Sequence, residues 1–156
     1  MTVADDLDQA IEQWRLATGE FIRGDPEPAQ ELFSHGTDVT LANPLGPTAP
    51  EIGPIAHGWG QVAMTQEHSS SQFTDGEDVD FEIVEKYVSP ELACVVLIER
   101  MKAKVVGSED TSSENAMRVA LRVTMTFRPE DGRWKVVHRH ADPLTTARPA
   151  ESVIQE

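Results

Sequence analysis

The sequence is poor in basic residues and in long apolar runs. Its 156 residues include 13 Lys and Arg against 27 Asp and Glu, which gives a formal net charge of −14. Such a charge repels phosphate backbones and anionic lipid headgroups, so we expect neither nucleic acid nor a membrane among the partners. No segment approaches the ~20 apolar residues of a membrane span, and no basic N-terminal region precedes an apolar stretch. The sequence therefore predicts a cytoplasmic protein, with one domain by length.

Cysteine and tyrosine occur once each, as Cys94 and Tyr87. A single cysteine excludes an internal disulfide, and its apolar neighbours indicate a reduced core residue. The sequence also has no glycine-rich phosphate loop and no elbow motif around a serine or cysteine nucleophile.

Hydrophobic periodicity predicts helices in the first half of the chain and strands in the second. The order of helices followed by an antiparallel meander is typical of an α+β fold. Helices are expected at about residues 3–23, 28–33 and 59–72, and strands at about 38–43, 79–88, 92–105, 117–128 and 132–143.

Three finer expectations accompany these elements. The third helix should bury Trp59, Val62, Ala63 and Phe73, and the nearly continuous apolar strand at 92–105 should be buried on both faces. Residues 44–60 form a loop dense in Pro and Gly, which is either a functional mouth or a structural insertion. The polar stretch 107–115 is expected to be a flexible turn.

The last predicted strand carries the densest set of polar candidates. Alternation with a period of two places five side chains on one face, which would form a pocket wall with chemistry at one end: Trp134, Val136, His138, His140 and Asp142. A bulge would reverse this pattern and turn Val137, Arg139 and Ala141 toward the pocket instead. Both alternatives stay open at the level of the sequence.

Several short motifs, in a fixed order, resemble the SnoaL-like branch of the nuclear transport factor 2-like superfamily, which includes ketosteroid isomerase. They are Ser34–Leu41, Asn43–Gly46, Gly58–Trp59, Ile98–Arg100, Leu121–Thr124 and Val137–Pro143. The resemblance runs from the first helix to Pro143. It implies a cone-shaped fold with N-terminal helices packed on a strongly curved, mainly antiparallel sheet, a pocket between the two layers, and a homodimer formed through the sheet. The domain then covers residues 1–143, and residues 144–156 form a C-terminal tail.

The comparison with ketosteroid isomerase fails at the residues that carry its chemistry. Asn43 stands where that enzyme type has its catalytic aspartate, and an amide cannot abstract a proton near neutral pH. The first helix has no tyrosine, and residues 117–127 have no carboxylic acid. Fold alone does not assign another activity.

The remaining candidates for chemistry are imidazoles, carboxylates and an amide. His138 and His140 could act as general acid or base, and Asp142, Asp38 or Glu99 could orient one of them. Asn43 could hold a substrate oxygen, whereas His35 is more typical of a cap.

Charged and aromatic residues within the strands have two interpretations each. Arg122 either forms an ion pair with Glu99 across neighbouring strands or binds an anion. Trp59 and Trp134 belong to the core or to a pocket wall. We expect no metal, because His138, His140 and Asp142 lie on one strand without a helical partner.

The predicted function is cofactor-free acid/base chemistry of the isomerase, cyclase or dehydratase type on a hydrophobic small molecule with a polar handle. The alternative is a non-catalytic small-molecule-binding or dimerisation domain. The sequence leaves both open.

Overall fold

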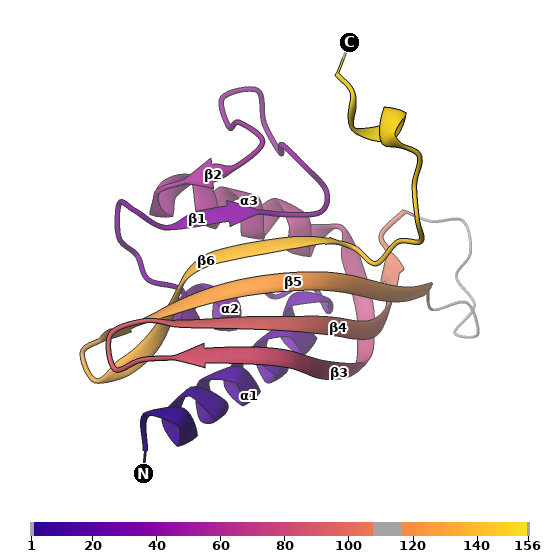
Figure 1. Ribbon diagram of the computed structural model, residues 1–156. Helices are drawn as coiled ribbons and strands as arrows, with labels where there is room; N and C mark the ends of the chain where they lie inside the picture. Colours follow the sequence, from indigo (N-terminus) through magenta and orange to yellow (C-terminus); the bar gives the residue numbers. More distant parts are fainter. Residues whose placement is uncertain (1, 108–116, 156) are drawn as a thin grey trace.

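Three helices cover one face of a six-stranded sheet in the computed structural model, which describes residues 2–107 and 117–155 (Figure 1). The helices are α1 (Val3–Phe21), α2 (Glu27–Leu32) and α3 (Trp59–Ser71). The strands are β1 (Thr40–Ala42), β2 (Ala56–His57), β3 (Phe73–Val88), β4 (Ala93–Val105), β5 (Met117–Glu130) and β6 (Arg133–Pro143). A short 3-10 helix, Ala150–Val153, lies in the tail. The turn predicted at 107–115 lies outside the described residues from position 108 onward.

The strands lie in the order β2-β1-β6-β5-β4-β3. All neighbours are antiparallel except β1 and β6, which run parallel. The predicted α+β class with a mainly antiparallel sheet is confirmed. The Pro- and Gly-rich loop contains β2, which pairs with β1.

Helix α1 begins at a capping box and packs its apolar stripe on the sheet. The Thr2 hydroxyl accepts a hydrogen bond from the Asp5 amide, and the Asp5 carboxylate accepts one from the Thr2 amide, both at 3.1 Å. Leu7, Trp14 and Ala17 recur on one side of the helix and are buried. The helix thus brings Trp14 against the middle of the sheet.

The two faces of the sheet differ, and we call the helix-covered face inner and the opposite face outer. Along β4, inward Val95 and Leu97 are buried, whereas outward Cys94, Val96 and Ile98 are only partly buried. The predicted burial of this strand on both faces and the predicted core position of Cys94 were therefore wrong. The physical reason is that no other described element of this chain covers the outer face (Figure 1).

Helix α3 buries a different stripe from the predicted one. Trp59, Ala63 and Phe73 are only partly buried, and Val62 alone of the predicted set is fully buried. The other buried side chains of the helix are polar: Thr65, Gln66, Ser69 and Ser70.

Candidate functional site

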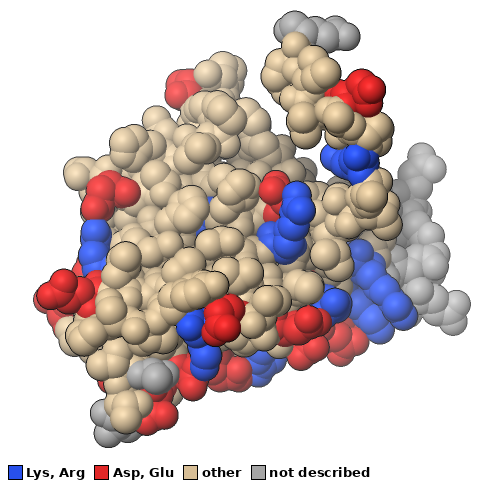
Figure 2. Space-filling model, in the orientation of Figure 1, with Lys and Arg blue, Asp and Glu red and all other residues tan. Residues whose placement is uncertain are grey.

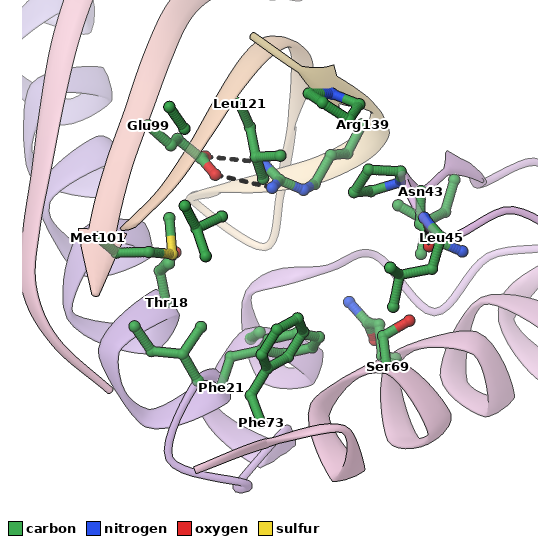
Figure 3. A pocket seen from close by; sticks show the side chains of 18 of the residues that line it. Thr18, Phe21, Asn43, Leu45, Ser69, Phe73, Glu99, Met101, Leu121 and Arg139 are labelled. Carbon is green, nitrogen blue, oxygen red and sulfur yellow. Dashed lines mark hydrogen bonds and ion pairs between the residues drawn. The ribbon is translucent and has the colours of Figure 1, made fainter. Parts of the chain in front are cut away.

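A cavity of about 490 Å³ lies between α1, α3 and the inner face of the sheet (Figure 3). Its walls are mainly apolar, and its volume falls in the range of small-molecule sites. Leu45 and Leu144 line it and are about half-exposed, so they mark its mouth. The apolar lining includes Phe21, Leu41, Phe73, Met101, Val119 and Leu121.

A bidentate ion pair closes one side of the cavity. Both guanidinium Nη atoms of Arg139 lie 2.7 Å from the two carboxylate oxygens of Glu99. The Trp14 indole N–H also donates to Glu99 at 3.3 Å, and Arg139 lies over the Trp14 ring at 5.4 Å. The Glu99 side chain is 0% exposed and that of Arg139 is 14% exposed. Each charge is therefore balanced within the protein, as a buried charge requires.

A bulge in β6 brings Arg139 to this position. Phe127 pairs with Val136 and Thr126 pairs with His138, so that Val137 is an extra residue on β6. One extra residue reverses which side chains face inward beyond it. Val136 and Ala141 are both buried although five positions separate them. The predicted uninterrupted alternation from Trp134 to Asp142 was therefore wrong, and the bulge alternative applies.

His138 and His140 consequently lie on the outer face. The His138 Nδ1 is hydrogen-bonded to the Thr40 hydroxyl at 2.8 Å, and burial, followed by the charge of His140, lowers the pKa of His138. The His140 Nε2 lies 3.1 Å from the Asp142 carboxylate, and both side chains are about half-exposed. Neither histidine nor Asp142 is among the described residues that line the cavity.

Arg122 also faces outward and does not pair with Glu99. It is exposed and stands opposite Ile98 and Asp142 in the sheet register, whereas Glu99 stands opposite Leu121. Of the two interpretations of Arg122, the ion pair with Glu99 was wrong, because neighbouring positions on paired strands point to opposite faces.

Asn43 lines the cavity, but its side chain already shapes a turn. Its Oδ1 accepts a hydrogen bond from the Leu45 amide at 2.7 Å, and its Nδ2 donates to the Gly46 carbonyl at 3.0 Å. These bonds fix the start of the loop that carries Leu45 to the cavity mouth.

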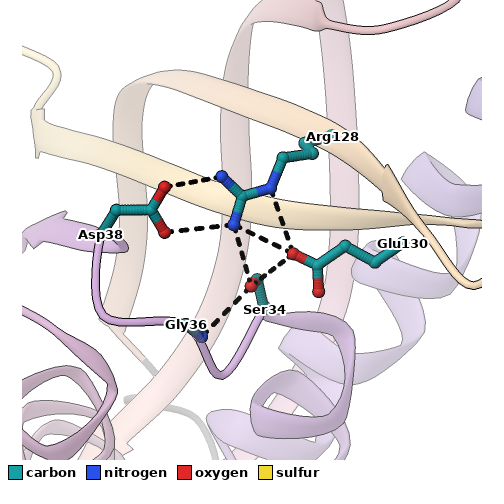
Figure 4. A network of polar contacts seen from close by, with 5 residues as sticks. All are labelled: Ser34, Gly36, Asp38, Arg128 and Glu130. Carbon is teal, nitrogen blue, oxygen red and sulfur yellow. Dashed lines mark hydrogen bonds and ion pairs between the residues drawn. The ribbon is translucent and has the colours of Figure 1, made fainter.

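Asp38 belongs to a separate polar network outside the cavity (Figure 4). The Arg128 guanidinium donates to both Asp38 oxygens at 2.7 and 3.1 Å and to Glu130 at 3.0 Å. The Ser34 hydroxyl donates to Glu130 at 2.6 Å. The hydrogen bonds from Arg128 lower the pKa of Asp38. The pKa of Glu130 is lowered most by the hydrogen bond from Ser34 and less by that from Arg128. This network ties the 34–38 turn to β5.

The two tryptophans predicted as core or pocket wall, Trp59 and Trp134, pack against the hydrophobic core. Trp59 stacks on the His35 ring with centroids 3.8 Å apart, and the His35 Nε2 lies 2.8 Å from the Gln30 carbonyl oxygen. Trp134 is partly buried against the hydrophobic core. Neither contributes to the lining of the cavity among the described residues.

Five cavity residues with polar groups in their side chains were missed by the sequence interpretation, whereas Arg139 was expected at the pocket only in the bulge alternative. The five are Trp14, Thr18, Gln66, Ser69 and Arg118. Gln66 and Ser69 come from the buried polar stripe of α3, an unusual composition for the inward side of a helix. That stripe was a readable signal, but only once the inward side of the helix was known.

Within residues 2–107 and 117–155, no group of three or more His, Cys, Asp or Glu side chains is placed to hold a metal ion. No helix in this part of the chain combines the length and the apolar character needed to cross a bilayer.

The fold is that of known nuclear transport factor 2-like structures. An NTF2-like superfamily protein from Salmonella enterica is 14% identical with a TM-score of 0.67, and 96% of each chain is covered. A candidate dehydratase of the NTF2-like family from Streptomyces avermitilis is 18% identical, with a TM-score of 0.64 and coverage of 91% of this chain and 96% of that one. A candidate calcium/calmodulin-dependent protein kinase type II association domain from Thiobacillus denitrificans is also 18% identical, with a TM-score of 0.63 and coverage of 88% and 94%.

The family itself follows from the sequence match. The family model of the SnoaL-like domain matches residues 45–145, which is more than half of the chain. The protein therefore belongs to the SnoaL-like domain family, and the resemblance found in the sequence is confirmed. No curated protein matches the chain.

Proposed function

We propose that this SnoaL-like domain binds a mainly apolar small molecule in the cavity between α1, α3 and the sheet. The observation that carries the proposal is an apolar cavity whose one buried ion pair, Glu99 with Arg139, is internally balanced. Burying the surface of an apolar molecule against such walls is favourable at roughly 25 cal/mol per Å². Trp14 lines the same space and adds an aromatic contact surface.

Binding is favoured over catalysis because the cavity offers few groups for proton transfer. The described lining residues include no histidine, and His138 and His140 face the opposite side of the sheet. Both oxygens of Glu99 are engaged by Arg139, and one also accepts from Trp14. A general base must reach the substrate proton, and these three hydrogen bonds hold the carboxylate against Arg139 and Trp14.

Cofactor-free acid/base chemistry is the second candidate, and one observation favours it. Glu99 places a fully buried carboxylate at the wall of the cavity, where a substrate that displaced Arg139 would meet it. The dehydratase name of the Streptomyces avermitilis structure agrees with this class of reaction. Turnover that Glu99→Gln abolishes, while circular dichroism shows that the variant is still folded, would support it.

The binding proposal is tested by native mass spectrometry of freshly purified protein, followed by denaturing analysis of any released molecule. Leu121→Trp should fill the cavity, because Leu121 lies on its wall. Leu92→Trp is the matched control, because Leu92 is 51% exposed and lies outside the lining. We expect wild type and the control to carry a small organic molecule, and Leu121→Trp to lack it. Bare wild-type protein that also fails to bind 2-methoxynaphthalene in calorimetry would contradict the proposal.

We also propose that the protein is a homodimer formed through the outer face of the sheet. This face carries partly buried Val96 and Ile98 and the exposed side chain of Tyr87, which stands opposite Cys94. Figure 2 shows it as mostly uncharged, with the charged side chains gathered mainly along the edge near β3. A large uncovered face of this composition is typical of an interaction surface.

A further inference from the structure

The cavity side of α3 is polar where a core-facing helix is normally apolar. Its buried residues Val62, Thr65, Gln66 and Ser69 follow the i, i+3, i+4, i+7 spacing of a single stripe. Only Val62 is apolar. Gln66 and Ser69 line the cavity, and Figure 3 shows Ser69 on the side of the cavity away from Glu99 and Met101.

Three polar atoms of this stripe are buried without a hydrogen-bond partner among the described residues: the Thr65 Oγ1, the Gln66 Oε1 and the Ser69 Oγ. Of these three residues, Gln66 and Ser69 line the cavity, and their side chains are only 4% and 7% exposed. The neighbouring Ser70 shows the usual arrangement, because its hydroxyl donates to the Phe21 carbonyl at 2.6 Å. A buried polar atom without a partner is costly and rare, and at a cavity wall a bound molecule can supply the missing hydrogen bond.

The charges around the cavity indicate that this ligand group is neutral. The Glu99 carboxylate and the Arg139 guanidinium satisfy each other in two 2.7 Å hydrogen bonds. Arg118 is the other charged residue in the described lining, and it is exposed, so water already solvates it. An ionised ligand group placed at Gln66 would therefore be desolvated without a counter-charge beside it.

We propose that Gln66 and Ser69 form the recognition point for a hydroxyl group on an otherwise apolar, neutral ligand. A hydroxyl donates one hydrogen bond and accepts others, so it can donate to the Gln66 carbonyl oxygen and accept from the Ser69 hydroxyl. The match holds for either orientation of the Gln66 amide, because the hydroxyl can equally accept from its NH₂ group and donate to Ser69. A ketone or an ether lacks the donor. The inference rests on the proposed ligand-binding function and adds the class of ligand, an apolar alcohol or phenol.

Three probes that share one ring system test this class. They are 2-naphthol, 2-methoxynaphthalene and 2-naphthoate, which present a hydroxyl, a capped hydroxyl and a carboxylate. Isothermal titration calorimetry at pH 7 gives the affinity of each. Wild-type protein should bind 2-naphthol roughly three- to tenfold more tightly than the methyl ether, the ratio expected for one or two neutral hydrogen bonds. It should bind 2-naphthoate most weakly.

Three variants locate the preference on α3. Gln66→Leu and Ser69→Ala should each reduce the ratio of naphthol to ether affinity toward one. Thr65→Val is the matched control. It also removes a buried hydroxyl without a partner, but Thr65 lies outside the described cavity lining, so the ratio should stay at the wild-type value.

The outcomes separate this inference from the proposed function. Equal affinities for naphthol and ether in wild type, or an unchanged ratio in Gln66→Leu and Ser69→Ala, would overturn the hydroxyl preference and leave the binding site standing. Tightest binding of 2-naphthoate would overturn it in favour of an anionic ligand. Absence of binding by all three probes, in protein that native mass spectrometry shows to be bare, would overturn both the inference and the proposed function. Because Gln66→Leu and Ser69→Ala remove unpaired polar groups, both variants should fold, which circular dichroism checks.

Discussion

The Glu99 carboxylate meets the Arg139 guanidinium in two parallel hydrogen bonds of 2.7 Å, although 40 positions separate the residues in the sequence. The pair joins β4 to β6 across β5 on the inner face of the sheet. Because Trp14 of α1 donates to the same carboxylate, one helix and two strands share a single polar contact point. The Glu99–Arg139 pair therefore connects elements of the fold and also forms part of the cavity wall.

Removing either charge should destabilise the protein strongly, and removing both should cost much less. Glu99→Met or Arg139→Met leaves one buried ion unpaired, at a cost of about 3–5 kcal/mol, whereas the double variant leaves none. Urea unfolding of the four proteins gives the coupling energy as a double-mutant cycle. The control is Glu82→Gln, which breaks the exposed pair with Arg100 at 2.8 Å and should cost at most about 1 kcal/mol. Additive costs for the two buried positions would refute the coupling.

The hydrogen-bond network around Arg128 should make the free energy of unfolding depend on pH. The pKa values of Asp38 and Glu130 are lowered in the folded protein, so the unfolded chain binds protons more readily. The resulting stabilisation is present above the unfolded values, at about pH 5, and is lost as the pH falls through the lower folded values. We expect the free energy of unfolding to fall between about pH 5 and pH 3, and to fall less steeply in Arg128→Gln. Denaturant titrations at each pH measure this, and parallel curves for the two proteins would contradict it.

Gly76 should not tolerate a side chain. A Cβ at this position would overlap the buried Ile22 side chain, whose Cδ1 and Cβ would lie only 2.7 and 2.8 Å away. Gly76→Ala should therefore destabilise the protein by about 1–3 kcal/mol through overpacking. Gly60→Ala in α3 meets open space and should instead stabilise by about 0.5–1 kcal/mol. Thermal unfolding compares the two, and equal effects would show that contact with Ile22 does not decide the outcome.

The proposed homodimer is tested by placing one charge on the outer face. Val96 is partly buried in the middle of this face, so Val96→Asp should produce a monomer in sedimentation velocity experiments. Val153→Asp in the tail is the control, because Val153 is 79% exposed. A monomeric wild type, or a Val96→Asp protein that remains dimeric, would exclude this interface.

The sequence predicted the elements well because periodicity reports on burial over many residues. The amphipathic stripe of α1 and the clean alternation of Val123, Met125 and Phe127 both appear in the structure as buried sides. The family and the α+β class followed from the order of these elements and from short motifs. Each of these signals is averaged over a long segment, so an error at one residue does not change it.

The site depended on single residues, and there the sequence was less informative. The extra residue Val137 lies between Val136 and His138, in a stretch with no glycine to mark a bulge. Because the place of the bulge cannot be read from the sequence, uninterrupted alternation put the two histidines on the cavity side and Arg139 on the other face. For the same reason an ion pair between Glu99 and Arg122 stayed one of two interpretations, because strand register decides whether the two side chains point to the same face.

The bulge at Val137 also has a consequence for what the cavity wall is made of. Val137 takes up one residue, so that His138 stays opposite Thr126 and Arg139 opposite Met125. If the strand instead paired without the bulge and with all its residues, the two sides beyond Val136 would be exchanged, which would carry His138 and His140 inward and Arg139 outward. The difference between a cavity wall made of a balanced ion pair and one made of imidazoles is thus one residue of strand register.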